Sequence, residues 1–179
     1  MALEAGTGTD PHHTPDAALF RAACGTFATG VTVVTAHAPT GPQGATVNSF
    51  ASLSVEPPQV VVCLARTSRT WSAAEAAGAF AVNVLAAEQR DVARLFASGA
   101  QDKLARVAWR PGFGGAPVLD GAAAHFECRL AGALRRATHM LLIGEVVHAE
   151  HRADAEPLIF FRSRMHEGLG MAAAARAGS

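Results

Sequence analysis

Apolar and β-branched runs alternate with short turn segments along most of the chain, which predicts a protein built mainly from strands. We expect strands over residues 31–36, 45–53, 59–65, 79–85, 122–130, 140–148 and 157–161. Within 45–53 the residues alternate with period two, as in a strand with two unlike faces. Gly, Pro or polar turns separate most of the runs. About seven strands without regular β-α-β alternation favour an antiparallel barrel over a mixed α/β sheet.

A short helix is predicted near the N-terminus, from Pro15 to Cys24. Proline suits the start of a helix, because the amide that it lacks would be unpaired there. We expect the face that packs on the core to consist of Leu19, Phe20 and Ala23. Residues 1–14 and 170–179 are expected to be flexible tails, which leaves one domain over residues 15–169.

Two further helices are predicted in the middle of the chain. Residues 68–77 are rich in alanine, and Ser68 and Gly78 supply an N-cap and a stop. Residues 88–97 bring apolar side chains to one face at helical spacing. The segment 98–117 contains several glycines and prolines, so we expect a long surface loop there.

Composition and charge narrow the possible partners. The 179 residues are half hydrophobic and carry 15 basic and 15 acidic side chains, without the basic excess that nucleic-acid binding needs. Cys24, Cys63 and Cys128 are widely spaced, which predicts neither a disulfide framework nor a zinc ligand pair, and the last two suit small core positions. No run approaches the ~20 apolar residues of a membrane span. Residues 1–14 lack an apolar run, so we do not expect them to be a secretion signal. We therefore expect a soluble cytoplasmic protein.

Several widespread motifs are missing from the sequence. There is no G-x-G-x-x-G after a predicted strand, no G-x-x-x-x-G-K-[ST] and no G-x-S-x-G. His148 and His151 flank Glu150 near a predicted strand end, but this spacing is not that of a metalloprotease helix. We interpret these side chains as a polar rim rather than a metal site, and predict no metal ligands.

The segment from Arg66 to Thr70 has the composition of an anion site. Its five residues supply two guanidinium groups and three hydroxyls, and a helix N-terminus is predicted beside them. A solvated helix cap is the alternative interpretation, and these residues alone favour neither.

A series of blocks along the chain together resembles the short-chain flavin reductase family. The blocks are 27–35 (FATGVTVVT), 45–54 (ATVNSFASLS), 56–60 (EPPQV), 80–85 (FAVNVL), 117–119 (PVL), 126–128 (FEC), His139 and 142–146 (LIGEV). No single block is specific, but their order and spacing are, and the resemblance extends over about residues 19–167. Members of this family are the reductase components of two-component flavin-dependent monooxygenases.

The resemblance implies an FMN-binding split β-barrel, antiparallel and Greek-key-like with a few short flanking helices, and usually a homodimer. It also implies hydride transfer from NADH or NADPH to FMN or FAD, after which reduced flavin diffuses to a partner monooxygenase. Such a transfer requires stacked rings and no catalytic acid, base or nucleophile from the protein. The alternatives are an oxidase or reductase with fixed flavin on the same fold, and a flavin-binding protein without enzyme activity.

By this resemblance the flavin ring lies against residues 46–54, with residues 29–32 covering part of it, and the flavin phosphate lies at residues 66–70. Small and polar side chains let backbone groups approach a flat ring and can bond to its heteroatoms. The expected flavin-binding residues are Thr29, Gly30, Val31, Thr32, Thr46, Val47, Asn48, Ser49, Ser52, Leu53, Ser54, Cys63, Leu64, Ala65, Arg66, Ser68 and Thr70.

The same resemblance places His139 beside the nicotinamide. The family has a Gly-Asp-His triplet before this strand, whereas this chain has Ala137, Thr138 and His139, so the aspartate that orients the histidine is absent. The last predicted strand and its turn would add contacts to the NAD(P)H phosphates, and a basic surface turn is the alternative. The residues concerned are Arg162, Arg164 and His166.

Overall fold

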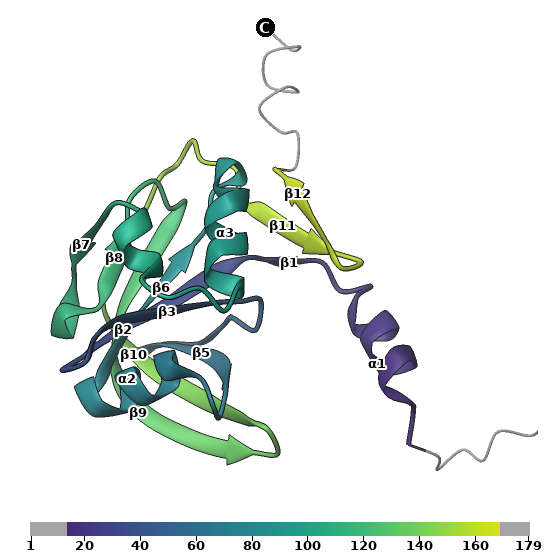
Figure 1. Ribbon diagram of the computed structural model, residues 1–179, viewed down its shortest axis with the longest axis horizontal. Coiled ribbons are helices and arrows are strands. Elements are labelled where there is room, and N and C mark those ends of the chain that lie inside the picture. The colour runs from purple at the N-terminus through teal and green to yellow at the C-terminus, as the bar shows by residue number, and fades with distance from the viewer. Residues whose placement is uncertain (1–13, 169–179) are drawn as a thin grey trace, which may run out of the picture.

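A seven-stranded antiparallel sheet is the centre of the computed structural model, which describes residues 14–168 (Figure 1). The sheet order is β3-β2-β6-β9-β10-β5-β4. Its strands are β2 (Thr32–Ala38), β3 (Gly41–Val47), β4 (Ala51–Val55), β5 (Pro58–Ala65), β6 (Ala79–Val84), β9 (Ala124–Arg136) and β10 (His139–His151). Three hairpins, β2–β3, β4–β5 and β9–β10, are joined by pairings between strands distant in the chain, namely β2–β6, β6–β9 and β5–β10, which is the Greek-key-like order expected.

The two edge strands of this sheet, β3 and β4, are consecutive in the chain. Only residues 48–50 connect them, and the four Cα steps from Val47 to Ala51 reach about 14 Å at most. The sheet must therefore curl until its two edges come close together. No ladder of hydrogen bonds joins β3 to β4 among the described residues, so the result is a barrel that is split between these two strands, as the resemblance implied.

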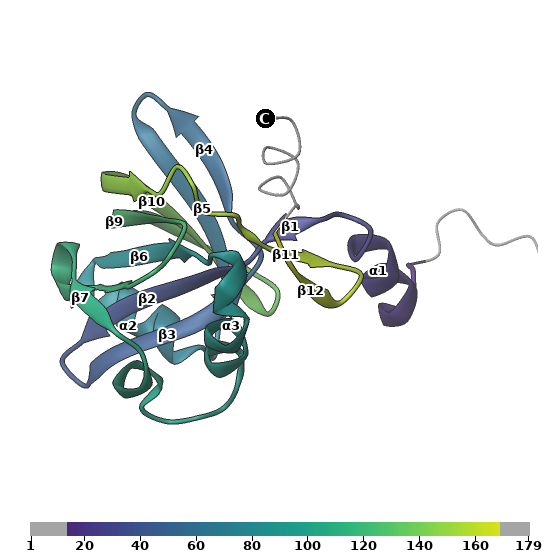
Figure 2. The same ribbon diagram turned by 90° about the horizontal axis from the view of Figure 1, so that it is seen from above.

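A second, three-stranded sheet extends from one side of the barrel and carries the N-terminal helix (Figure 2). It contains β1 (Thr29–Gly30), β11 (Leu158–Phe161) and β12 (Arg164–Glu167), in the order β1-β11-β12. The helix α1 (Ala17–Cys24) precedes β1, and the amide of Arg162 donates a hydrogen bond to the carbonyl oxygen of Gly25 at its end.

The helix α1 occurs where it was expected, but its predicted buried face is wrong. Asp16 caps it by accepting hydrogen bonds from the amides of Ala18 and Leu19. None of its residues is buried, and Leu19 and Phe20 are 60% and 59% exposed. Helical periodicity identifies an apolar face but not what covers it, and here the small sheet holds the helix away from the barrel.

The helices α2 (Arg69–Ala77) and α3 (Arg90–Ala97) cover the barrel and confirm the predicted segments. The hydroxyl of Ser68 accepts the amide of Thr70, and Gly78 ends α2 with a φ of 62°, a conformation that glycine adopts without strain. Trp71 of α2 enters the main apolar cluster of the barrel. A 3₁₀ turn, η1 (Ala87–Gln89), leads into α3.

Two predicted segments differ from the structure. Residues 45–53 are not one strand, because residues 48–50 cross the split between β3 and β4. The loop expected over 98–117 contains η2 (Lys103–Arg106), β7 (Trp109–Pro111) and η3 (Phe113–Gly115), and its end pairs as β8 (Pro117–Leu119) with β7. β8 is buried, and the hydroxyl of Thr35 and the side chain of Asn83 satisfy polar groups of its backbone.

Two of the three cysteines belong to the sheet. Cys128 is buried, as expected for a small core residue, and burial raises the pKa of its thiol to about 12. Cys63 is half-buried beside the split, and all three cysteines are unpaired. The predicted tails lie outside the described residues except Thr14. Within residues 14–168, no helix has both the length and the apolar character needed to cross a membrane.

Candidate functional site

The three segments expected around the flavin ring meet at the split of the barrel. The hydroxyl of Ser49 donates to the carbonyl oxygen of Cys63 at 2.9 Å and accepts its amide at 3.0 Å. The hydroxyl of Thr32 donates to the carbonyl oxygen of Val47 at 3.0 Å. These bonds hold residues 46–49 against β2 on one side and β5 on the other, so Thr32, residues 46–49 and Cys63 are brought together. Thr29 and Gly30 pair with β11 in the second sheet instead.

Some polar side chains of this region serve the fold and others are free for a ligand. The hydroxyl of Thr46 donates to the carbonyl oxygen of Ala93 in α3, so it is engaged, like those of Thr32 and Ser49. Asn48 and Ser52 are exposed and form no side-chain hydrogen bond with any described residue. The hydroxyl of Thr29 is buried without a partner in the described part of the chain, and a buried hydroxyl left unbonded is costly.

A cleft of about 460 Å³ adjoins this region. It lies between β3, the start of α2 and the segment that follows α3. Three of the expected flavin-binding residues line it, namely Thr46, Ser68 and Thr70. Residues 96–105 form the opposite wall. The sequence prediction missed this wall, because the segment has loop-like composition and no motif.

The cleft is positively charged. Arg69 and Lys103 both line it, and no acidic side chain except the exposed Asp102 does. The ammonium of Lys103 donates to the carbonyl oxygen of Phe96 at 2.9 Å. Burial, together with the charge of Arg69, lowers the pKa of Lys103 from its ordinary value. Two cations beside the N-terminus of α2 make this a place where an anion would be stabilised.

Arg66 is separated from the rest of the predicted anion segment. It does not line the cleft, and its amide donates to the carbonyl oxygen of Thr138 at 2.9 Å. Its guanidinium lies 3.5 Å from the carbonyl oxygen of Ala137. The residues of segment 66–70 therefore lie in two different places. Arg66 contacts the tip of the β9–β10 hairpin, and Ser68 and Thr70 line the cleft.

His139 lies at the same hairpin tip, exposed and directly opposite Ala65 of β5. Its Nδ1 is 2.9 Å from the hydroxyl of Thr138. Thr138 occupies the position of the aspartate in the family's triplet, so a hydroxyl provides the orienting contact that was expected to be missing. His139 is thus adjacent to the split and to Arg66.

The remaining residues of the expected nicotinamide set lie elsewhere. The β11–β12 hairpin of the second sheet contains Arg162, Arg164 and His166. Figure 1 shows this hairpin at the right of the view, well above the β9–β10 tip at the bottom. The guanidinium of Arg162 stacks on Phe161, 5.2 Å from the ring centre. A single chain therefore does not bring these three residues to His139.

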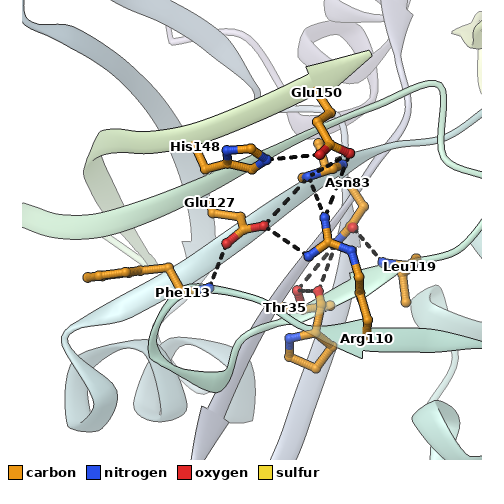
Figure 3. A network of polar contacts seen from close by, with 10 residues as sticks. Thr35, Asn83, Arg110, Phe113, Leu119, Glu127, His148 and Glu150 are labelled. Carbon is orange, nitrogen blue, oxygen red and sulfur yellow. Dashed lines mark hydrogen bonds and ion pairs between the residues drawn. The ribbon is translucent and has the colours of Figure 1, made fainter. Parts of the chain in front are cut away.

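A polar cluster occupies the other end of the β9–β10 pair (Figure 3). His125 and Glu127 of β9 face His148 and Glu150 of β10, and Arg110 of β7 reaches between them. Glu127 is only 6% exposed, and it also accepts the amide of Phe113. The sequence placed His148 and Glu150 on a polar rim, but His125 and Arg110 carried no signal because they join the cluster only through strand register.

Known proteins with a similar sequence were found over most of the chain. A family model described as a flavin reductase like domain matches residues 24–169. A probable flavin reductase of Rhizobium meliloti is 44% identical over 137 residues, which are 76% of this chain and 44% of that protein. The reductase subunit HsaB of a flavin-dependent monooxygenase from Mycobacterium tuberculosis is 39% identical over 149 residues, covering 82% of this chain and 80% of the subunit.

Solved structures agree with these sequence matches. The NADH:FAD oxidoreductase SgcE6 of Streptomyces globisporus, in complex with NAD and FAD fragments, superposes with a TM-score of 0.81. The two chains are 37% identical, and the match covers 85% of this chain and 92% of that one. This chain spans less than half of the first R. meliloti relative but most of HsaB and SgcE6.

Proposed function

The chain belongs to the family of flavin reductase-like domains, and we propose that it is an NAD(P)H-dependent reductase of free flavin. NADH or NADPH is the hydride donor, and FMN or FAD is the acceptor. Reduced flavin then leaves for a separate flavin-dependent monooxygenase. The observation that carries the proposal is the meeting of Thr32, residues 46–49 and Cys63 at the split, next to a cationic cleft.

We assign the flavin ring to the split of the barrel. Asn48 and Ser52 are exposed there, and neither side chain is hydrogen-bonded to any residue within 14–168. Flavin heteroatoms alternate as donors and acceptors, so amide and hydroxyl groups suit either role. The residues present therefore fit a flavin.

The flavin phosphate belongs in the adjoining cleft. Ser68 and Thr70 stand at the start of α2, and Arg69 and Lys103 supply two cations. Charge-assisted hydrogen bonds to phosphate are stronger than neutral ones. The volume of about 460 Å³ leaves room for more than one phosphate, so either FMN or FAD fits.

His139 orients the nicotinamide in this proposal. A bound flavin supplies the redox chemistry by accepting a hydride from the reduced nicotinamide, and the protein contributes position and exclusion of water. The contact of His139 Nδ1 with Thr138 fixes the ring plane and leaves Nε2 free to bond a carboxamide. No acid or base is required.

A homodimer is part of the proposal. Several large apolar side chains are exposed on the single chain, and a protein–protein interface normally covers such a set. They are Leu19, Phe20, Phe27, Leu53, Val55, Leu134 and Val147. A second copy would also be the source of the Arg162, Arg164 and His166 contacts that one chain does not bring to His139. The three unpaired cysteines agree with a cytoplasmic location.

Oxidation of NADH and of NADPH, followed by absorbance with and without added FMN or FAD, tests this function. Turnover is expected only with added flavin, and the reduced flavin should pass a dialysis membrane. A rate that stays at the flavin-free background with both flavins refutes the proposal. Activity with flavin that stays bound through gel filtration would instead indicate an oxidase or reductase with fixed flavin.

A further inference from the structure

Three potential metal ligands converge at the end of the β9–β10 pair that is remote from His139. They are His125, His148 and Glu150, and one ligand atom of each lies within 4.8 Å of the other two. His125 Nε2 is 3.8 Å from Glu150 Oε2, and His148 Nε2 is 3.1 Å from Glu150 Oε1. Strand register produces this cluster, because His125 pairs directly with Glu150 across the ladder.

The cluster already holds a cation, the guanidinium of Arg110 (Figure 3). Its NH2 group is 3.2 Å from His125 Nε2 and 3.8 Å from Glu150, while its NH1 group is 3.3 Å from Glu127. A guanidinium can only donate, so His125 must accept with a lone pair on Nε2. A neutral imidazole that directs this lone pair into the cluster is the form that binds metals.

The cluster is built around a fixed, buried imidazole. His125 is 7% exposed, and its Nε2 faces Arg110 and the carboxylates of Glu127 and Glu150. His148 Nε2 lies on the other oxygen of Glu150. Two imidazoles and a carboxylate therefore direct ligand atoms into one small volume.

We propose that His125, His148 and Glu150 bind a zinc-class divalent cation, which displaces the guanidinium of Arg110. Bonds of about 2.0–2.1 Å in tetrahedral geometry put ligand atoms about 3.3 Å apart. His125 Nε2 and His148 Nε2 lie 3.8 and 3.1 Å from Glu150, each from a different oxygen of the carboxylate, and both distances are close to that spacing. His148 and Glu150 are about half exposed, at 48% and 60% of their side chains, so they can close on an ion while the buried His125 stays in place.

A fourth position is open to water or to Glu127. Glu127 Oε1 lies 3.6 Å from His125 Nε2, and its other oxygen stays on the amide of Phe113. Arg110 is 47% exposed, so its guanidinium can turn into solvent when the ion enters. A divalent ion brings two positive charges in place of the single charge of Arg110. These two charges balance the carboxylates of Glu127 and Glu150.

Zinc binding is tested by titrating the protein with ZnCl₂ in a calorimeter, and with CoCl₂ while following the visible spectrum. All proteins should carry His12→Ala and His13→Ala, because two histidines adjacent in the sequence can bind metal ions on their own. One equivalent should bind with micromolar or tighter affinity, and cobalt should give the strong visible bands of a tetrahedral site. Neither titration needs flavin or nicotinamide, so the outcome is independent of the proposed reductase function.

His148→Ala should weaken zinc binding by at least about tenfold, the lower limit seen even when a supporting partner of a ligand is lost. His151→Ala is the matched control, since His151 is an exposed histidine on the same strand outside the cluster, and it should bind as before. His148 is exposed, so its replacement should not disturb folding, and the melting temperature without metal verifies this.

Arg110→Gln distinguishes a metal site from a salt-bridge network. If the guanidinium competes with the ion, this variant should bind zinc about tenfold or more tightly than the parent protein. It should also melt lower without metal, because buried Glu127 loses its partner, and zinc should restore the loss. Unchanged or weaker zinc binding by Arg110→Gln, absence of a one-equivalent complex, or equal effects of His148→Ala and His151→Ala would each overturn the proposal.

Discussion

The hydroxyl of Ser49 bonds to both backbone groups of Cys63, at 2.9 Å to the carbonyl oxygen and 3.0 Å to the amide. One side chain thus satisfies both backbone groups of Cys63, whereas residues of a neighbouring strand do so elsewhere along β5. The next ladder pairs begin at Ala51 with Val61. Ser49 therefore extends the β4 side of the sheet across the connection at the split, and keeps the flavin segment attached to β5.

Replacing Ser49 by Ala should lower both stability and flavin affinity. Two hydrogen bonds are lost, and because the site is exposed, water replaces part of them, so we expect a loss of about 1–2 kcal/mol in unfolding free energy. The KM for flavin should rise as residues 48–50 detach. Ser49→Thr retains the hydroxyl and should recover most of the loss. Urea unfolding and flavin titration measure the two effects, and a fully stable Ser49→Ala protein would contradict the role.

The cationic cleft predicts a phosphate-specific defect. Lys103→Ala should raise the KM for FMN about tenfold, since a charge-assisted contact is worth roughly 1.5–3 kcal/mol. The KM for riboflavin, which lacks the phosphate, should change little. Arg106→Ala removes a neighbouring cation that does not line the cleft and serves as the control. Equal defects with FMN and riboflavin would mean that the bond from Lys103 to Phe96 matters for folding and not for phosphate.

His139 and Thr138 predict a defect on the nicotinamide side. His139→Ala should raise the KM for NAD(P)H, or lower kcat, by about fivefold, the equivalent of one hydrogen bond of roughly 1 kcal/mol. Flavin affinity should stay within about twofold. Thr138→Val removes the contact at Nδ1 and should give a smaller change of the same kind. His151→Ala, at the far end of β10, is the control. A silent His139→Ala with a normal fold would remove this residue from the site and direct attention to His166.

Two glycines of the β9–β10 pair predict opposite outcomes. A Cβ on Gly144 would lie 2.5 Å from Phe80 and 2.8 Å from Cys128, whereas a Cβ on Gly132 would meet nothing nearer than 3.9 Å. Overpacking of a core costs about 1–3 kcal/mol, which is roughly 2–12 °C in a domain of this size. Gly144→Ala should lose that much in thermal melting, and Gly132→Ala should lose almost nothing. Similar melting temperatures for the two variants would contradict the packing around Phe80.

The lowered pKa of His125 predicts acid sensitivity. Burial favours the neutral ring in the folded protein, so the unfolded chain takes up the proton at higher pH than the folded chain does. This contribution to stability is complete above the ordinary pKa of 6.5 and is lost as the pH falls through the lower, folded value. With EDTA present, the urea concentration at the unfolding midpoint should decrease when the pH is lowered from 7.5 to 5.5. His125→Asn should reduce that fall, while His151→Asn should leave it unchanged.

Local signals in the sequence were sufficient for much of the fold. Ser68 and Gly78 delimit α2 because a cap and a left-handed glycine act on their own neighbours. The split was harder to locate, because the alternation over residues 45–53 continues through the connection at 48–50. That break depends on the curl of the whole sheet, which no window of the sequence contains.

The site residues that were not predicted from the sequence reach their sites only through contacts between segments distant in the chain. Lys103 reaches the cleft from a segment with loop-like composition, and His125 meets Glu150 only because of the register of β9 with β10. Thr138 is a different case. The sequence shows only that threonine stands where the family has aspartate, whereas the structure shows its hydroxyl 2.9 Å from His139 Nδ1. Residue type alone did not reveal that compensation.

The place of β6 in the sheet has a consequence for the folding kinetics of the chain. The pairs β2–β3, β4–β5 and β9–β10 are local hairpins, and each closes a short loop. β6 instead joins β2 to β9, with Val34 opposite Val82 and Val82 opposite Phe126, and β5 reaches β10 with Leu64 opposite Met140. These pairings join strands that are far apart in the chain. The entropy cost of closing such long loops comes before the contacts form, and this cost slows folding. The hairpins should gain protection from amide exchange early during refolding, and β6 should become protected in the rate-limiting step that unites them.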